Sequence, residues 1–115
     1  MDIKVSDYGS TSFYQPKPKK FELKESRNAP RKVLKETVGS PYFCAPEVLK
    51  GGYDEKCDIW SVGVICYMLL SGRPPFEGKD ELEIVKAVKK GKYSLDIPEM
   101  INVTAEAKDF IKHVL

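Results

Sequence analysis

Residues 58–76 read DIWSVGVICYMLLSGRPPF and include the most apolar stretch of the chain. Ten of the twelve residues from Ile59 to Leu70 are hydrophobic, so the stretch lacks the single apolar stripe of a surface helix. It is also shorter than the roughly 20 apolar residues that a membrane span requires. We therefore predict a helix from Ile59 to Ser71, opened by Asp58, in the centre of a larger fold.

Two shorter helices are predicted on either side of this stretch. Pro46 suits the first turn of a short helix that stops at Gly51. Residues 80–90 predict a surface helix, because acids fall in its first turn and lysines in its last, as the helix dipole favours. The residues spaced for its buried face are Leu82, Val85 and Val88.

The sequence predicts a strand near its start and an amphipathic helix at its end. Residues 3–6 alternate apolar and polar side chains, which is typical of a short strand. Thr104 is a favourable N-cap for the last helix, and the apolar stripe of that helix runs to the last residue. Such a stripe predicts a domain that continues further. Its members are Ala107, Phe110, Ile111, Val114 and Leu115. The expected fold is mainly α, with a short β-strand and four helices.

Residues 15–35 differ in composition from the rest of the chain. They contain eight lysines or arginines, two glutamates and three prolines, with too few large apolar side chains to bury a core. We expect a mobile, solvated basic insert, with a basic docking or nuclear-targeting patch as the alternative.

Composition indicates a soluble globular protein of cytoplasmic type. The chain is 42% hydrophobic and carries a net charge of +2, which predicts no nucleic-acid or membrane partner. Its first ten residues lack the apolar core of a secretory signal. Cys44, Cys57 and Cys66 stand in apolar surroundings without a ligand cluster around His113, which favours reduced, buried thiols over metal or catalytic sites.

Four motifs follow one another in a fixed order: DYG at 7–9, GSPYFCAPE at 39–47, DIWSVG at 58–63 and SGRPPF at 71–76. Each alone has a packing explanation, such as a strand-ending turn or a helix stop. Together they resemble the second half of a eukaryotic protein kinase catalytic domain. The stretch from Tyr53 to Phe76 most resembles the calcium/calmodulin-dependent group, and in particular the calcium-dependent protein kinases.

This resemblance implies a partial C-terminal lobe of a kinase in three regions. Residues 1–14 would form a strand and a magnesium-binding loop, residues 15–35 a basic insert in the activation segment, and residues 36–115 the end of that segment and a helical subdomain. The cofactors implied are ATP and Mg²⁺.

Roles for individual residues also follow from the resemblance. Asp7 would bind the magnesium ion that bridges the ATP phosphates, and Gly9 would allow the backbone change between active and inactive forms. Glu36 falls near a position that many kinases phosphorylate, where its charge would replace part of a phosphate. Thr37 is the competing phosphorylation site, and a solvated Glu-Thr pair is the plain alternative.

The later motifs would form the substrate pocket and its support. Ser40 carries the hydroxyl typical of serine/threonine kinases, and Glu47 would close the activation segment. The remaining pocket residues implied are Gly39 and Pro41. The residues implied to support the active site are Asp58, Trp60 and Gly63.

The 115 residues contain no glycine-rich phosphate loop, His-Arg-Asp catalytic loop or EF-hand motif. The expected function is therefore that of a fragment of a serine/threonine protein kinase, which transfers the ATP γ-phosphoryl group to protein hydroxyls but is inactive as this isolated chain. Its partners would be protein substrates and a regulatory protein or the missing kinase lobe. The alternatives are a non-catalytic, truncated kinase-like protein acting as a binding module, and a basic adaptor that binds acidic partners.

Overall fold

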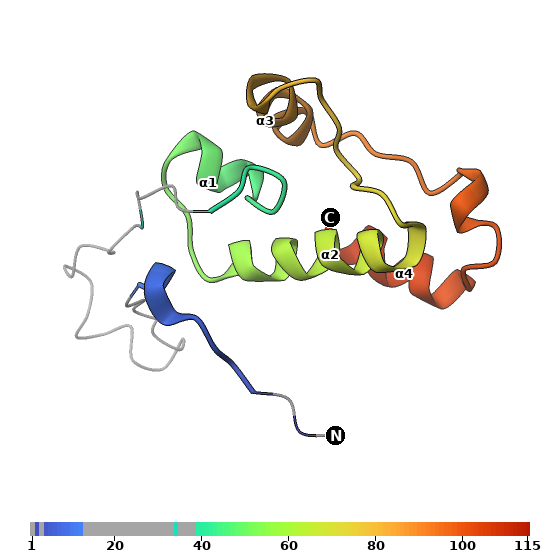
Figure 1. The fold of residues 1–115 in the computed structure, drawn as a ribbon, viewed down its shortest axis with the longest axis horizontal. Coiled ribbons are helices and arrows are strands. Elements are labelled where there is room, and N and C mark those ends of the chain that lie inside the picture. The colour runs from blue at the N-terminus through green and yellow to red at the C-terminus, as the bar shows by residue number, and fades with distance from the viewer. Residues whose placement is uncertain (1, 3, 13–33, 35–38) are drawn as a thin grey trace, which may run out of the picture.

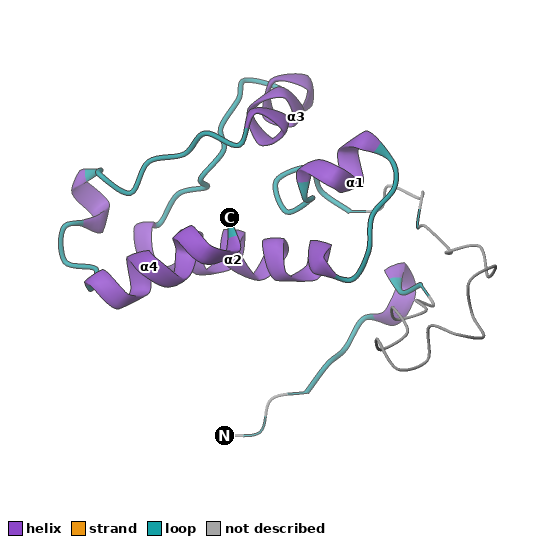
Figure 2. Cartoon of the chain, turned by 180° about the vertical axis from the view of Figure 1, so that it is seen from behind, coloured by secondary structure: helices purple, strands orange, loops and turns teal. Residues whose placement is uncertain are grey.

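The computed structural model describes residues 2, 4–12, 34 and 39–115, and the statements below concern this part of the chain. It contains four α-helices and two 3-10 helices (Figures 1 and 2). The α-helices are α1 (Pro46–Lys50), α2 (Lys56–Ser71), α3 (Glu81–Lys90) and α4 (Ala105–Val114). The 3-10 helices are η1 (Tyr8–Ser10) and η2 (Pro98–Met100). The mainly α fold with four helices is confirmed for these residues.

The longest helix, α2, is the element around which the others are arranged. In Figure 1, α4 runs along one half of α2, while α1 and α3 lie on the opposite side. At Gly63 the end of α4 lies close against α2, because a Cβ atom there would lie 2.6 Å from Cγ2 of Val114. Among the described residues, no helix is long and apolar enough to cross a membrane.

The predicted start of α2 at Ile59 is wrong by one turn. The Asp54 side chain accepts a hydrogen bond from the backbone N–H of Lys56 at 3.1 Å, and the N–H of Asp58 donates to the Glu55 carbonyl. These bonds extend the helix upstream to Lys56. Asp58 therefore does not open α2 but lies in its first turn, where the helix dipole favours a negative charge.

The other helix ends follow the predicted local signals. Asp80 caps α3 by accepting a hydrogen bond from the N–H of Glu83, and Thr104 caps α4 by accepting one from the N–H of Ala107. Both α2 and α3 end at glycines in the left-handed region, Gly72 with φ 73° and Gly91 with φ 65°. Residues with a side chain rarely adopt this backbone conformation, so glycine is the expected residue at both ends.

The core consists of three small clusters that share α2. One cluster joins Val64 of α2 to Phe76, Ile84 and Val88. A second lies around α1, and a third joins Tyr67 to η2 and α4; their buried members are Cys44, Ala45, Val48, Tyr67, Met100 and Ile111. Trp60 packs against the first two clusters. The helices are therefore held together mainly through side chains of α2.

Aromatic contacts connect α2 to the segment after it. Trp60 stacks on Phe76 with ring centroids 5.6 Å apart, and Tyr93 contacts both Phe76 and Tyr67 edge-on. The Tyr67 hydroxyl also donates to the Ser94 carbonyl at 2.9 Å. This chain of rings fixes the connections that precede and follow α3.

The buried face of α3 differs from the prediction. Ile84 and Val88 are buried, whereas Leu82 is 71% exposed. Residues 84 and 88 are four apart and lie on one side of a helix, but residue 82 is two positions from 84 and points elsewhere. The predicted spacing is compatible with helical geometry, and Val88 is buried as predicted. The buried stripe, however, begins at Ile84 and not at Leu82.

The short strand predicted over residues 3–6 is absent from the described residues 4–6. An isolated strand leaves its backbone hydrogen-bonding groups unpaired, and no neighbouring strand is present in this part of the chain. The one β-bridge described pairs Leu34 with Tyr53 in antiparallel orientation.

One face of α2 carries a row of exposed apolar side chains, here called the α2 stripe. Ile59 is 55% exposed, Val62 45%, Ile65 46% and Leu69 80%. Their spacing of three or four residues places them on one side of the helix. The helix was predicted to need neighbours on all sides, and the described residues leave this side uncovered.

The 115-residue chain in isolation is expected to fold poorly. The α2 stripe exposes contiguous apolar surface, which favours aggregation. Circular dichroism should show no sharp thermal transition, and size-exclusion chromatography should show concentration-dependent association. As a matched pair, Leu69→Gln should reduce association, whereas Leu82→Gln, which changes an isolated exposed leucine of α3, should not. A sharp two-state melt of a monomer would contradict this expectation.

Candidate functional site

The sequence-predicted metal ligand Asp7 stands at a backbone conformation that few residues adopt. Its φ of 63° and ψ of 68° lie in the left-handed region, and it is the single described non-glycine residue with positive φ. This conformation costs roughly 1–2 kcal/mol for a residue with a Cβ atom, although aspartate tolerates it better than most. Strain of this kind concentrates at functional positions, and it turns the chain sharply before η1.

The surroundings of Asp7 are open to solvent. Asp7 and Gly9 are both exposed, and Tyr8 is 66% exposed. The Tyr8 hydroxyl donates to the Val5 carbonyl at 3.1 Å. The hydrogen-bond partner of this hydroxyl is thus local, and most of the side chain is open to solvent.

The sequence predicts Asp7 as a metal ligand, and its side chain has a single carboxylate. No group of three or more histidine, cysteine or acidic side chains that could hold a metal occurs in the described residues. Mg²⁺ is commonly bound by one or two carboxylates, with phosphate oxygens and water as the other ligands. An exposed carboxylate without an ion-pair partner among the described residues fits that demand.

The predicted pocket residues form a turn that leads into α1. The N–H of Phe43 donates to the Ser40 carbonyl at 3.1 Å, closing the turn over residues 40–43. Gly39 precedes it with φ 100°. Gly39 and Ser40 are exposed, and Pro41 is half-buried. The turn therefore presents its first residues to solvent.

Buried residues fix the turn from the other side. Cys44 is 8% exposed and Ala45 is fully buried, and both belong to the cluster around α1. The Ser61 hydroxyl of α2 donates to the Phe43 carbonyl at 2.8 Å. Sequence reasoning missed Ser61, because a bond between residues eighteen positions apart has no local sequence signal.

Glu47 is half-buried in α1, and it forms no ion pair with a described residue. Its charge contributes to the environment of Cys57, whose pKa is raised to about 11 by burial first and then by Asp58, Glu47 and Asp54. Burial also raises the pKa of the Cys44 thiol. Both thiols stay protonated at neutral pH, so neither has the thiolate character of a catalytic cysteine. Cys66 is also a free thiol and is half-buried.

The predicted support residues all lie on α2 but have different surroundings. Asp58 is exposed, and its Oδ1 accepts a weak hydrogen bond from the Cys57 thiol at 3.7 Å. Trp60 stacks on Phe76, and its buried indole N–H has no hydrogen-bond partner in the described part of the chain. Gly63 is buried against α4.

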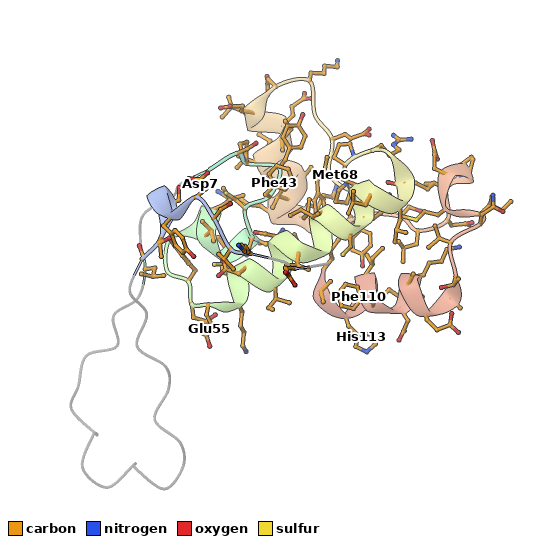
Figure 3. The ribbon with its side chains drawn as sticks, turned by 60° about the horizontal axis from the view of Figure 1, so that its bottom comes forward. Asp7, Phe43, Glu55, Met68, Phe110 and His113 are labelled. Atoms are coloured by element: carbon orange, nitrogen blue, oxygen red, sulfur yellow. The ribbon has the colours of Figure 1, made fainter. Side chains whose placement is uncertain are left out.

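The structure brings some predicted residues together and leaves others apart. The turn at 40–43 is bonded to α2, whereas no hydrogen bond or ion pair between described residues joins Asp7 to the turn or to Asp58. Figure 3 shows Asp7 beside η1 and Phe43 on the separate segment that precedes α1. Glu36 and Thr37 lie outside the described residues, as does almost all of the basic insert over 15–35.

Other side chains define features away from the predicted site. A surface pocket of about 350 Å³ lies beyond the C-terminal end of α2, with Tyr67, Arg73, Tyr93 and Lys92 among its lining residues, and none of the predicted site residues lines it. His113 points away from α2 (Figure 3) and contacts the Asp109 carbonyl through Nδ1.

Comparison with known proteins gives matches over the whole chain. A family model described as "Protein kinase domain" matches residues 1–115. Calcium-dependent protein kinase 4 of Plasmodium berghei (strain Anka) and of Plasmodium falciparum (isolate 3D7) are each 44% identical over 115 residues, which is 100% of this chain. Calcium-dependent protein kinase 5 of Plasmodium berghei (strain Anka) is 54% identical over 78 residues, which is 68% of this chain and 14% of that protein.

The chain spans 19% of the length of the first two of these relatives. The similarity therefore concerns one part of proteins that are much longer.

Proposed function

The chain belongs to the protein kinase family, and from this premise we propose that it forms part of a serine/threonine kinase. The reaction is transfer of the ATP γ-phosphoryl group to serine or threonine hydroxyls of protein substrates. The residues of this chain contribute the end of the active site at Asp7 and the substrate-binding turn over 39–43. The isolated chain is proposed to be inactive, because phosphoryl transfer depends on positioning and charge stabilisation that one magnesium ligand does not supply.

The observation that carries this proposal is the left-handed backbone of Asp7, whose exposed carboxylate has no ion-pair partner among the described residues. A bound Mg²⁺ would neutralise charge on the phosphates during transfer. Asp7 would hold that ion, together with phosphate oxygens and water. Gly9 follows within the same short 3-10 turn, where a backbone change would redirect the carboxylate.

Specificity for serine or threonine rests on the turn over 39–43. Ser40 presents a hydroxyl from an exposed position, and the turn is closed by the bond from Phe43. The resemblance to the calcium-dependent group supports serine/threonine over tyrosine as acceptor. Calcium control is a further expectation that the names of the similar proteins supply. A cytoplasmic location stays a prediction.

The test uses the protein expressed from its full coding sequence, incubated with magnesium and radiolabelled ATP, with and without calcium. Four peptides serve as substrates. They are identical except at the acceptor position, which holds serine, threonine, tyrosine or, as a blank, alanine. Label should enter the serine and threonine peptides and be absent from the tyrosine and alanine peptides. Transfer to tyrosine alone would contradict the proposed specificity.

A complete lack of transfer would instead favour the non-catalytic binding module. The exposed α2 stripe is the observation that supports this second candidate, because contiguous apolar surface is typical of protein interfaces. Copurification of a stoichiometric partner, lost in Leu69→Gln, would then be expected.

A further inference from the structure

Two serines of α2 use their hydroxyl groups as donors to backbone carbonyls, Ser61 in the first half of the helix and Ser71 at its last residue. The Ser61 hydroxyl lies 2.8 Å from the Phe43 carbonyl, and the Ser71 hydroxyl lies 2.9 Å from the Arg73 carbonyl. Each hydroxyl also has the carbonyl four residues earlier as an alternative acceptor, at 3.2 Å from Ser61 and at 2.8 Å from Ser71. The two differ in their nearer acceptor: for Ser71 it is a carbonyl of its own helix, whereas for Ser61 it is a carbonyl of a distant segment.

The segment that Ser61 holds is the turn over residues 40–43. A serine hydroxyl has one proton to donate, and the shorter of the two distances runs to Phe43. That carbonyl belongs to the residue whose N–H closes the turn onto Ser40. A side-chain bond at one end of the turn therefore restrains the exposed residues at its other end.

The turn has one other described attachment to the core, because Tyr42 packs against the cluster that contains Val64 of α2. Gly39 and Ser40 are exposed, and Phe43 is 36% exposed. Pro41 and Tyr42 are half-buried, and full burial begins at Cys44 and Ala45. The bond from Ser61 is thus the hydrogen bond that joins the turn to α2, and Tyr42 adds an apolar contact. In Figure 1 this segment lies above the first half of the helix.

We propose that Ser61 is a positioning residue for protein-substrate binding, which holds the substrate-binding turn over 39–43 on α2 through the Phe43 carbonyl. The inference rests on the proposed function, under which this turn receives the substrate. Ser61 touches neither substrate nor ATP. Its loss should weaken binding of the protein substrate and leave ATP binding and the chemical step nearly unchanged.

The experiment compares Ser61→Ala, Ser61→Thr and Ser71→Ala in the protein expressed from its full coding sequence. In Ser61→Ala, KM for a peptide substrate should rise roughly fivefold, the equivalent of one hydrogen bond, with KM for ATP and kcat within about twofold. Ser61→Thr keeps a hydroxyl, so its KM for the peptide should stay near that of the unmodified protein. Ser71→Ala removes a hydroxyl that donates to a backbone carbonyl at the last residue of α2. It should leave KM for the peptide unchanged.

Hydrogen–deuterium exchange gives a readout that needs no catalytic activity. Amides over 39–45 should exchange roughly fivefold faster in Ser61→Ala and at the original rate in Ser71→Ala. The protein could show no phosphoryl transfer while exchange over 39–45 is faster only in Ser61→Ala. Ser61 would then still anchor the turn, and the proposed kinase function would be the part that is wrong. Unchanged exchange over 39–45, or equal effects of the two alanine variants on exchange or on KM, would overturn the inference.

Discussion

Replacing Asp7 with asparagine is expected to reduce phosphoryl transfer by the full kinase on the order of a hundredfold to a thousandfold. The substitution keeps the size of the side chain and removes the negative charge that a magnesium ion requires. The left-handed backbone at this position suits asparagine nearly as well as aspartate, so the fold should not change. Initial rates of peptide phosphorylation at saturating ATP measure the effect.

Asp2 supplies the control for this experiment. It is also exposed and lies five positions upstream, so Asp2→Asn makes the same chemical change in the same segment. Its rate should stay within about twofold of the unmodified protein, as is usual for surface substitutions. A titration of magnesium adds a second readout, because loss of a ligand should raise the concentration needed for half-maximal rate. An Asp7→Asn enzyme with the original rate and magnesium dependence would show that Asp7 is not a metal ligand.

The largest expected loss of stability follows from truncation of Phe76. This side chain is 2% exposed, stacks on Trp60 and contacts Tyr93 edge-on. Phe76→Ala should lower the free energy of unfolding by about 3–5 kcal/mol, because it removes buried area and leaves a cavity. Urea denaturation of the protein expressed from its full coding sequence, followed by circular dichroism, measures the change.

Phe76→Leu separates the contribution of volume from that of the ring contacts. Leucine fills much of the space, so the expected loss is about 1–2 kcal/mol, which includes the lost aromatic pairs. A second comparison uses Ile111→Ala and Ile101→Ala, since residue 111 is fully buried and residue 101 is 78% exposed. If Phe76→Ala cost no more than Ile101→Ala, the cluster around Phe76 would not be part of the stable core.

Local signals were sufficient to predict most helix ends from the sequence. The N-cap at Thr104 forms with its own side chain, and the stop after α1 occurs at Gly51. Asp80, predicted as the first residue of its helix, is instead its N-cap. In each case the deciding hydrogen bond joins residues within four positions of one another. Such signals can be read in any short window of sequence.

Each prediction that failed depended on which of several candidate residues forms a contact in the folded chain. The start of α2 moved to Lys56 because Asp54, rather than Asp58, provides the first side-chain acceptor. The strand over 3–6 required a partner that no sequence window could guarantee. Leu82 followed helical spacing, but the choice of buried face depends on what packs opposite α3.

The candidate site was predictable in part, for similar reasons. The order of the motifs predicted Asp7, Ser40 and Glu47 as site residues. The strained backbone at Asp7 is consistent with that prediction. The bond from Ser61 to Phe43 and the bond from Tyr67 to Ser94 could not be anticipated, because they join segments eighteen or more residues apart. Tertiary hydrogen bonds of this kind become visible only when the helices are placed.

The position of Trp60 has an optical consequence. It is the only tryptophan of the 115 residues, and it touches both the cluster around α1 and the cluster that contains Phe76. Indole emission from this segment therefore originates at the junction of two clusters, beside an aromatic ring 5.6 Å away. A red shift of that emission would register solvent entry into either cluster, so a single fluorophore reports on the packing of both α1 and α3 against α2.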